Sequence, residues 1–186
     1  MIENVGTKLG KYFFNKGYIE EDDIDAVRYY VEVFFNEYFQ LLITIFIGYF
    51  ISQFKETILY LIFFVAIRKY SGGYHAKTLL MCNLISYLLY FCGLFFNECL
   101  SINFLIPILF ISFLYLWIKG SVYSSEQIEF KFMDKQTKKL RIVLLILLIL
   151  CLLYQQGQYL GLLSIVIVQV VLMNIVKERR IEYEVY

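Results

Sequence analysis

The sequence predicts an all-α, polytopic integral membrane protein with about six transmembrane helices and an amphipathic N-terminal helix. Three observations lead to this fold class. Hydrophobic residues make up 60% of the 186 residues, whereas soluble chains are about 45–50% apolar. The mean hydropathy of +0.66 comes from several separate apolar runs. Lys and Arg residues lie almost entirely on alternate connections between those runs. We therefore expect a single membrane domain over residues 1–186.

The first expected element is a cytoplasmic or interfacial helical leader over residues 1–37. Four of its residues recur at the i, i+3, i+4 and i+7 spacing of one helix face: Val27, Tyr30, Val31 and Phe34. This periodicity predicts an amphipathic helix that lies on the membrane surface, with Asp22 or Asp23 as its N-cap, and that runs into the first span. A solvated leader packed on cytoplasmic loops is the alternative. The first span begins near Val33 or near Tyr38.

Six apolar runs form the predicted bundle over residues 38–176, and a cytoplasmic tail over residues 177–186 follows it. The runs cover residues 38–52, 57–67, 79–96, 102–118, 142–153 and 159–176. The second and fifth runs are shorter than the roughly 20 residues that a straight span needs. They become long enough if flanking residues continue the helix, or if the membrane is locally thin.

The distribution of positive charge predicts the orientation. If the N-terminus is cytoplasmic, all but one of the 17 Lys and Arg residues lie in cytoplasmic segments, and Lys55 is the exception. These segments are residues 1–37, 68–78, 119–141 and 177–186. Because short cytoplasmic loops are rich in Lys and Arg, we expect both termini on the cytoplasmic side.

Composition also argues against several function classes. A net charge of +1 provides no general attraction to nucleic acid, so no nucleic-acid partner is expected. The four cysteines are scattered, no pair has the spacing of metal ligands, and a single histidine cannot support a Cys/His zinc site. We expect no metal and no cofactor.

The segment 119–141 is expected to be a basic cytoplasmic loop. Its lysines Lys135, Lys138 and Lys139 are the candidate substrate-binding residues, because they could dock an acidic peptide or anionic lipid headgroups. The alternative is purely topogenic: the positive charge only holds this loop in the cytoplasm.

Residues 68–82 combine the chain's one histidine, His75, with a cysteine, Cys82, beside an apolar run. Cysteine attack needs a neighbouring base, and His75 is the available imidazole. On one continuous helix, seven residues would separate the pair by about 10.5 Å along the axis. We therefore expect the helix to exclude His75 and to begin after Thr78 as N-cap, with Gly72 and Gly73 letting the chain fold back.

In that arrangement Cys82 lies in the first turns of the third span, where the helix dipole stabilises a thiolate. Pairing of His75 with Cys82 across a dimer interface is the other geometric solution. Ser71, Asn83 or Glu37 could orient the imidazole, and the sequence does not select among them. Arg68 either snorkels at the helix end or holds a carboxylate or backbone carbonyl in the fold-back segment.

Taken singly, each of these features has a plain structural explanation. A histidine at a membrane interface is often an amphipathic anchor, and paired glycines usually mark a turn. A cysteine in an apolar helix is usually a small buried hydrophobe.

The order of Arg68, Gly72-Gly73, His75 and Cys82 between two apolar runs resembles the accessory gene regulator protein B (AgrB) family. These proteins are membrane-embedded cysteine endopeptidases of Gram-positive quorum sensing. The resemblance implies that Cys82 is the nucleophile, that His75 is the base and later the acid, and that Arg68 and Gly73 support the site.

The resemblance also implies a substrate and a reaction. The family cleaves the C-terminal part from an AgrD-like autoinducer propeptide through an acyl-enzyme thioester, and a thiolactone or lactone ring then closes. A homodimer, a multi-pass location in the plasma membrane of a Gram-positive-type bacterium and an active site toward the cytoplasm are implied as well.

Two other functions stay open. In a small membrane peptide transporter, His75 and Cys82 would only line a passage. A transporter should place ionisable residues in mid-membrane, whereas here they cluster at the cytoplasmic edge, which favours the enzyme. A catalytically inactive scaffold that tethers the propeptide is the third possibility.

Overall fold

The computed structural model describes residues 2–72, 76, 78–121, 130–153 and 157–184, and for residues 2–3, 130–132 and 180–184 it describes the backbone alone. These residues form seven α-helices and one short 3-10 helix, in agreement with the all-α prediction. The helices are α1 (Ile2–Asn15), η1 (Glu21–Asp23), α2 (Ile24–Phe50), α3 (Phe54–Ser71), α4 (Leu79–Cys99), α5 (Ile102–Lys119), α6 (Phe130–Leu153) and α7 (Gly157–Glu184).

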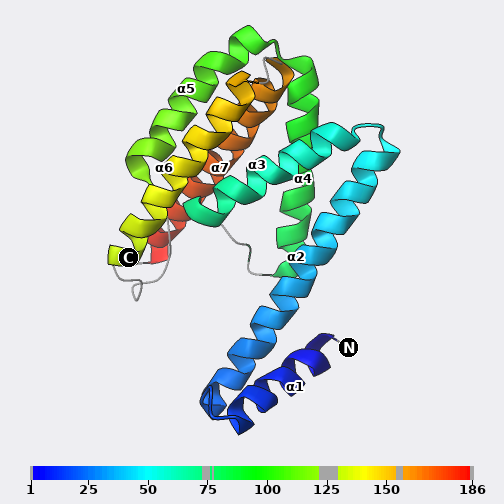
Figure 1. Cartoon of the computed structure of the whole chain (residues 1–186), viewed down its shortest axis with the longest axis vertical. Helices are drawn as coiled ribbons and strands as arrows, with labels where there is room; N and C mark the ends of the chain where they lie inside the picture. Colours follow the sequence, from blue (N-terminus) through cyan, green and yellow to red (C-terminus); the bar gives the residue numbers. More distant parts are fainter. Residues whose placement is uncertain (1, 73–75, 77, 122–129, 154–156, 185–186) are drawn as a thin grey trace.

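Helix α7 is the centre of the bundle (Figure 1), and it packs against α3, α4, α5 and α6. Every residue from 161 to 167 is buried, as expected for a helix that is apolar all round. Gln169 connects it to its neighbours, because its amide accepts from the Tyr60 hydroxyl at 2.9 Å and donates to the Leu89 carbonyl at 2.8 Å. Helix α7 therefore forms the core around which the other helices are arranged.

Helix α2 is continuous from Ile24 to Phe50, so the predicted amphipathic stretch and the first span are one helix. Asp23 occupies its N-cap position, but its side chain makes no capping hydrogen bond. Helix α1 folds back along the first turns of α2 (Figure 1). This close approach depends on small residues, because a Cβ at Gly6 would lie 2.9 Å from the Arg28 Cα.

Within the residues that the structure describes, four helical segments are long and apolar enough to cross a membrane: residues 21–50, α4, α5 and the part of α7 up to Arg179. The short runs 57–67 and 142–153 lie within α3 and α6, and flanking residues do extend both helices. Charged flanks such as Lys55 and Arg68 in α3 accompany the extension. The chain is thus an all-α membrane protein, and the number of six spans stays a prediction.

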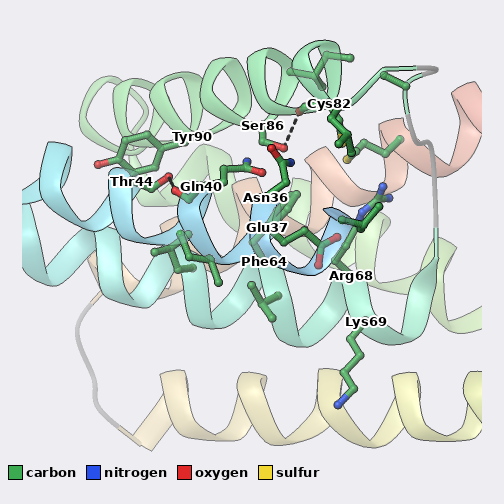
Figure 2. Close-up of a pocket in the computed structure, with 18 of the residues that line it drawn as sticks. Asn36, Glu37, Gln40, Thr44, Phe64, Arg68, Lys69, Cys82, Ser86 and Tyr90 are labelled. Carbon is green, nitrogen blue, oxygen red and sulfur yellow. Dashed lines mark hydrogen bonds between the residues drawn. The ribbon is translucent and has the colours of Figure 1, made fainter. Parts of the chain in front are cut away.

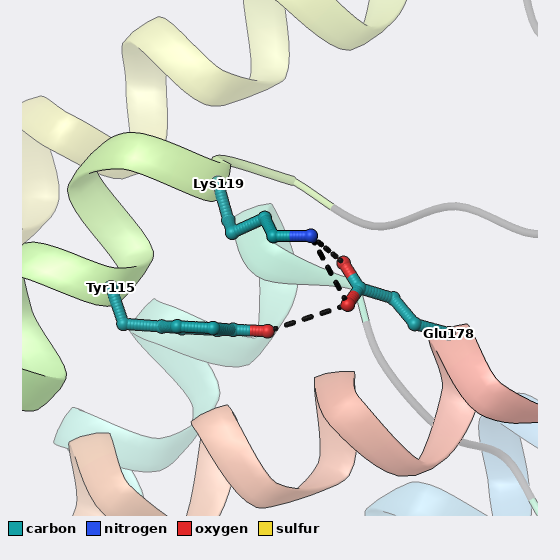
Figure 3. A network of polar contacts seen from close by, with 3 residues as sticks. All are labelled: Tyr115, Lys119 and Glu178. Carbon is teal, nitrogen blue, oxygen red and sulfur yellow. Dashed lines mark hydrogen bonds and ion pairs between the residues drawn. The ribbon is translucent and has the colours of Figure 1, made fainter.

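The described parts of the basic segments 68–78, 119–141 and 177–186 meet at one end of the bundle. The Ser121 hydroxyl donates to the Tyr70 carbonyl at 2.5 Å, and the Lys139 ammonium lies 5.9 Å from the Tyr70 ring centre. Lys119 pairs with Glu178 at 3.4 Å, and the Tyr115 hydroxyl donates to the same carboxylate (Figure 3). This convergence is the arrangement expected if the three segments share one side of a membrane.

The prediction of a loop over 119–141 is wrong from residue 130 onward, because α6 begins at Phe130. The basic residues of its C-terminal part therefore lie on helical turns. Lys138 and Asp134 form an i, i+4 ion pair of 2.6 Å, and such pairs stabilise helices. The four-residue spacing of Asp134 and Lys138 indicated a helix, but the segment had been interpreted as a loop from its positive charge alone.

Candidate functional site

A cavity of about 560 Å³ lies between α2, α3 and α4, and Cys82 lines it. Figure 2 shows that side chains from all three helices point into it. Arg68 and Glu37 share the end that contains Cys82, and Thr44 and Tyr90 lie toward the other end. Each of the three helices thus contributes one wall of the cavity. The candidate nucleophile, Cys82, lies at one end of it.

Cys82 lies in the first turn of α4, as predicted. Thr78 is the N-cap: its backbone is extended, and its hydroxyl accepts from the Met81 N–H at 3.3 Å. The Cys82 N–H donates to the Thr78 carbonyl at 3.1 Å, which begins the helical ladder. The thiol is partly buried. The sulfur is thus near the positive end of the α4 helix dipole.

Arg68 lies in the last turn of α3 and holds the chain as it leaves that helix. Its Nη1 donates to the Gly72 carbonyl at 2.7 Å, so of the two predicted roles the structure shows the carbonyl-holding one. Gly72 has φ of +71°, a backbone conformation that favours glycine, as the fold-back prediction requires. Burial lowers the pKa of the Arg68 guanidinium to about 10, while the neighbouring Cys82 and Glu37 act in the opposite direction. The group therefore remains protonated at neutral pH.

The three candidates for orienting His75 have different surroundings. Asn83 is engaged elsewhere, because it and Asn36 exchange two hydrogen bonds of 2.9 Å between α4 and α2. The buried Ser71 hydroxyl donates to the Gly72 carbonyl at 3.2 Å. Glu37 is exposed and lines the cavity near Arg68 (Figure 2). Of the three candidates, Glu37 alone lines the cavity beside Cys82, and its carboxylate points into it (Figure 2).

His75 and Gly73 lie outside the described residues, so their predicted roles stay predictions. The helix boundaries agree with the expected arrangement, because α3 ends at Ser71 and α4 begins at Leu79. Gly72 and Ala76, the nearest described residues on either side of His75 in the sequence, both line the cavity that contains Cys82.

The three predicted substrate-binding lysines do not line this cavity. Lys138 is paired with Asp134, and Lys139 lies over the ring of Tyr70. Lys135 is exposed on the same helix. Any part they take in substrate binding would therefore be outside the cavity that Cys82 lines.

Comparison with known proteins establishes the family. The family model described as Accessory gene regulator B (AgrB) matches residues 3–176. This chain belongs to the AgrB family. The resemblance expected from residues 68–82 is thereby confirmed, and it extends over nearly the whole chain.

Two curated proteins are similar to this AgrB-family chain. Protein FsrB of Enterococcus faecalis is 28% identical over 132 residues, which cover 68% of this chain and 54% of FsrB. An AgrB-like protein of Clostridium acetobutylicum is 28% identical over 103 residues, which cover 55% of this chain and 47% of the relative. The chain therefore spans about half the length of the curated relatives that it matches. No solved structure matches it.

The polar wall that α2 contributes to the site was missed by sequence reasoning. Asn36, Gln40 and Thr44 are spaced four residues apart, and all three line the cavity. Side chains at this spacing lie on one helix face. A polar stripe within an otherwise apolar run was the signal that could have identified α2 as part of the site of this AgrB-family protein.

Metal chemistry has no candidate centre in the part of the chain that the structure describes, where no group of three or more His, Cys, Asp or Glu side chains could hold a metal ion. The chemistry available from the described lining of the cavity is that of a thiol, a guanidinium, an ammonium, a carboxylate and several amides and hydroxyls. Nucleophilic attack by Cys82 is the reaction type that these groups suit best.

Proposed function

We propose that this protein is a membrane cysteine endopeptidase that cleaves the C-terminal part of an AgrD-like autoinducer propeptide and promotes cyclisation of the remaining peptide. One observation carries the proposal: Cys82 lies in the first turn of α4, and it shares a cavity with Arg68 and with the residues on either side of His75, Gly72 and Ala76. Membership of the AgrB family supports the same conclusion.

In the first step, His75 takes the proton of the Cys82 thiol, and the thiolate attacks a peptide carbonyl carbon of the propeptide. The C–N bond breaks, the leaving amine receives the proton from His75, and a thioester joins the acyl part to Cys82. The helix dipole and the protonated Arg68 stabilise negative charge at this place.

In the second step, a thiol or hydroxyl of the propeptide attacks the thioester carbonyl. His75 takes the proton of the attacking group and gives it to the Cys82 sulfur as the carbon–sulfur bond breaks. The thiol is thereby regenerated, and a thiolactone or lactone ring is released. Water is not consumed in this step. A cavity walled by three helices favours ring closure over hydrolysis, because it limits the access of water to the thioester.

The proposed site of cleavage is the cytoplasmic side of the membrane. The basic segments that meet at one end of the bundle face the cytoplasm, so newly made propeptide reaches Cys82 from that side of a Gram-positive-type plasma membrane. The amphipathic part of the propeptide would lie on the membrane beside the enzyme. A homodimer is part of the proposal and could bring His75 of one chain to Cys82 of the other.

Co-expression with the cognate propeptide, followed by mass spectrometry, tests this function. Wild type should yield a cleaved fragment and a covalent adduct on Cys82, and Cys82→Ala and His75→Ala should yield neither. Cys99→Ala is the matched control, because Cys99 is an exposed thiol at the far end of the same helix. Cleavage that persists without Cys82 would disprove the nucleophile assignment. Uncleaved propeptide appearing across the membrane would support the transporter instead.

A further inference from the structure

We propose that the part of the cavity running from Cys82 toward Tyr90 binds the residues of the propeptide on the acyl side of the scissile bond, and that it selects for uncharged side chains there. The inference rests on the proposed function and adds to it a binding site and a chemical class of substrate segment. It concerns the walls of α2 and α4 beyond the reactive sulfur.

The dimensions of this part suit a short peptide segment. Cys82 and Tyr90 both line the cavity and are eight residues apart on α4, which corresponds to about 12 Å of helix. An extended chain rises about 3.3 Å per residue, so three or four residues would fit along this wall. The whole cavity, to which this part belongs, has a volume of about 560 Å³, within the usual range of roughly 300–1,000 Å³ for pockets that enclose drug-sized ligands.

The charge of the lining changes along the cavity. Its charged members are Glu37, Arg68 and Lys69, and Figure 2 shows all three on the side of Cys82. Away from that end the polar groups are uncharged, and they include the amide of Gln40 and the hydroxyls of Thr44, Ser86 and Tyr90.

Amide and hydroxyl groups can hydrogen-bond to a peptide backbone without selecting a side-chain charge. A charged substrate side chain in the same place would lose hydration and find no ionic partner, which is costly. The lining therefore discriminates against charged residues in the bound segment.

The reaction itself suggests which side of the scissile bond this part holds. After cleavage the amine fragment leaves, whereas the acyl segment stays attached to the Cys82 sulfur until the ring closes. A walled space adjoining that sulfur keeps the acyl segment oriented for intramolecular attack. Ser86, whose hydroxyl donates to the Cys82 carbonyl at 3.0 Å, lies one helical turn further along this wall.

A reactive peptide tests the inference without the propeptide. The probe is acetyl-Ala-Ala-Leu-Phe chloromethyl ketone, whose residues occupy the acyl side and whose methylene carbon is attacked by the Cys82 thiolate with loss of chloride. Its rate of Cys82 alkylation in the full chain, reconstituted in lipid vesicles, is compared with that of iodoacetamide, which needs no subsite. Mass spectrometry of the Cys82 peptide separates this thiol from the other cysteines.

Ser86→Trp fills the cavity, and Leu88→Trp is its control on the exposed side of the same helix, where Leu88 is 63% exposed. Ser86→Trp should lower the ratio of the two alkylation rates by about tenfold or more, the equivalent of about 1.4 kcal/mol. Leu88→Trp should leave the ratio unchanged. An unchanged ratio in Ser86→Trp would overturn the proposal.

A second measurement keeps the wild-type chain and changes the probe, so it does not depend on folding of a variant. Replacing the probe's Leu by Glu or by Lys should slow alkylation by about tenfold, because the charge loses hydration. Equal rates for charged and uncharged probes would overturn the proposal. Failure of the proposed function is recognised separately, by a wild-type chain that forms no adduct with the propeptide.

Discussion

At the scale of single residues, the site depends on where α3 ends and α4 begins. Thr78 caps α4 and thereby fixes Cys82 in its first turn, while Arg68 holds the Gly72 carbonyl where the chain leaves α3. Gly72 is the residue that lets the chain turn there, because its φ of +71° strains any residue with a Cβ. A one-residue change at this position should therefore disturb the site more than the bundle.

Gly72→Ala should reduce propeptide cleavage by about tenfold or more while the protein still folds, because the strain of about 1–3 kcal/mol falls on the segment that contains His75. Gly17→Ala is the matched control: Gly17 also has positive φ, +73°, but a Cβ added there would meet nothing within 4 Å, and the residue is far along the chain from the site. Cleavage and the unfolding temperature in detergent would be measured for both. Equal loss of cleavage in the two variants would contradict a local role for Gly72.

At the scale of helices, the cavity lies between α2, α3 and α4, and α2 and α3 diverge from the turn that joins them (Figure 1). At the turn between them a Cβ on Gly48 would overlap the Thr57 side chain, so glycine permits the contact. The Thr57 hydroxyl in turn lies 2.8 Å from that of Tyr90 on α4. Small and polar residues therefore join the three walls at the end opposite Cys82.

Gly48→Ala should lower the free energy of unfolding by about 1–3 kcal/mol, because the added methyl group overpacks the contact between α2 and α3. Gly157→Ala is the control, since a Cβ there would meet its nearest neighbour, Ile102, at an ordinary 3.5 Å. Unfolding of the purified proteins in detergent micelles measures both. A stable Gly48→Ala variant would show that the two helices can separate without cost.

The hydrogen bond between Tyr60 and Gln169 joins α3 to α7, and its partners should be energetically coupled. Gln169→Leu should cost about 1–3 kcal/mol, because it leaves the buried Tyr60 hydroxyl unsatisfied. Adding Tyr60→Phe should recover part of that loss, since both partners are then apolar. Strictly additive losses in a double-mutant cycle would argue against coupling across this bond.

At the scale of the whole molecule, the helices bring the basic segments to one end and the Lys55 end of α3 to the other. The Gln53 amide donates to Glu98 at this second end, which joins the start of α3 to the end of α4. The fold therefore separates an end rich in Lys and Arg from an end that has few of them. This is the distribution expected of a membrane protein whose positive side faces the cytoplasm.

Cysteine accessibility should place the two ends on opposite sides of the membrane. In a chain whose four native cysteines are replaced by Ala, Lys55→Cys should react with an impermeant maleimide in intact cells. Lys138→Cys should react only after permeabilisation. Both native lysines are exposed, so burial does not limit labelling. Reaction of both from outside would refute the predicted orientation and with it the cytoplasmic position of Cys82.

Local signals in the sequence predicted much of this arrangement. Apolar runs predicted the helices, the Thr78 cap predicted the start of α4, and paired glycines predicted the turn after α3. The bounds of α3 and α6 were underestimated, because charged residues such as Lys55 and Lys138 were assigned to connections although they continue a helix. Hydropathy indicates which residues favour lipid. It does not indicate where a helix ends, because the end is set by backbone hydrogen bonding.

By itself the sequence determined the helical membrane class, the AgrB resemblance and the segment that holds Cys82, because each of these depends on residues that are neighbours along the chain. Only the tertiary structure decided that α2 forms a wall of the site, with Asn36 hydrogen-bonded to Asn83 and Gln40 lining the cavity. It likewise decided that the predicted lysines lie on α6, away from Cys82. The physical reason is that the pairing of helix faces depends on packing between segments far apart in the sequence, which local patterns do not record.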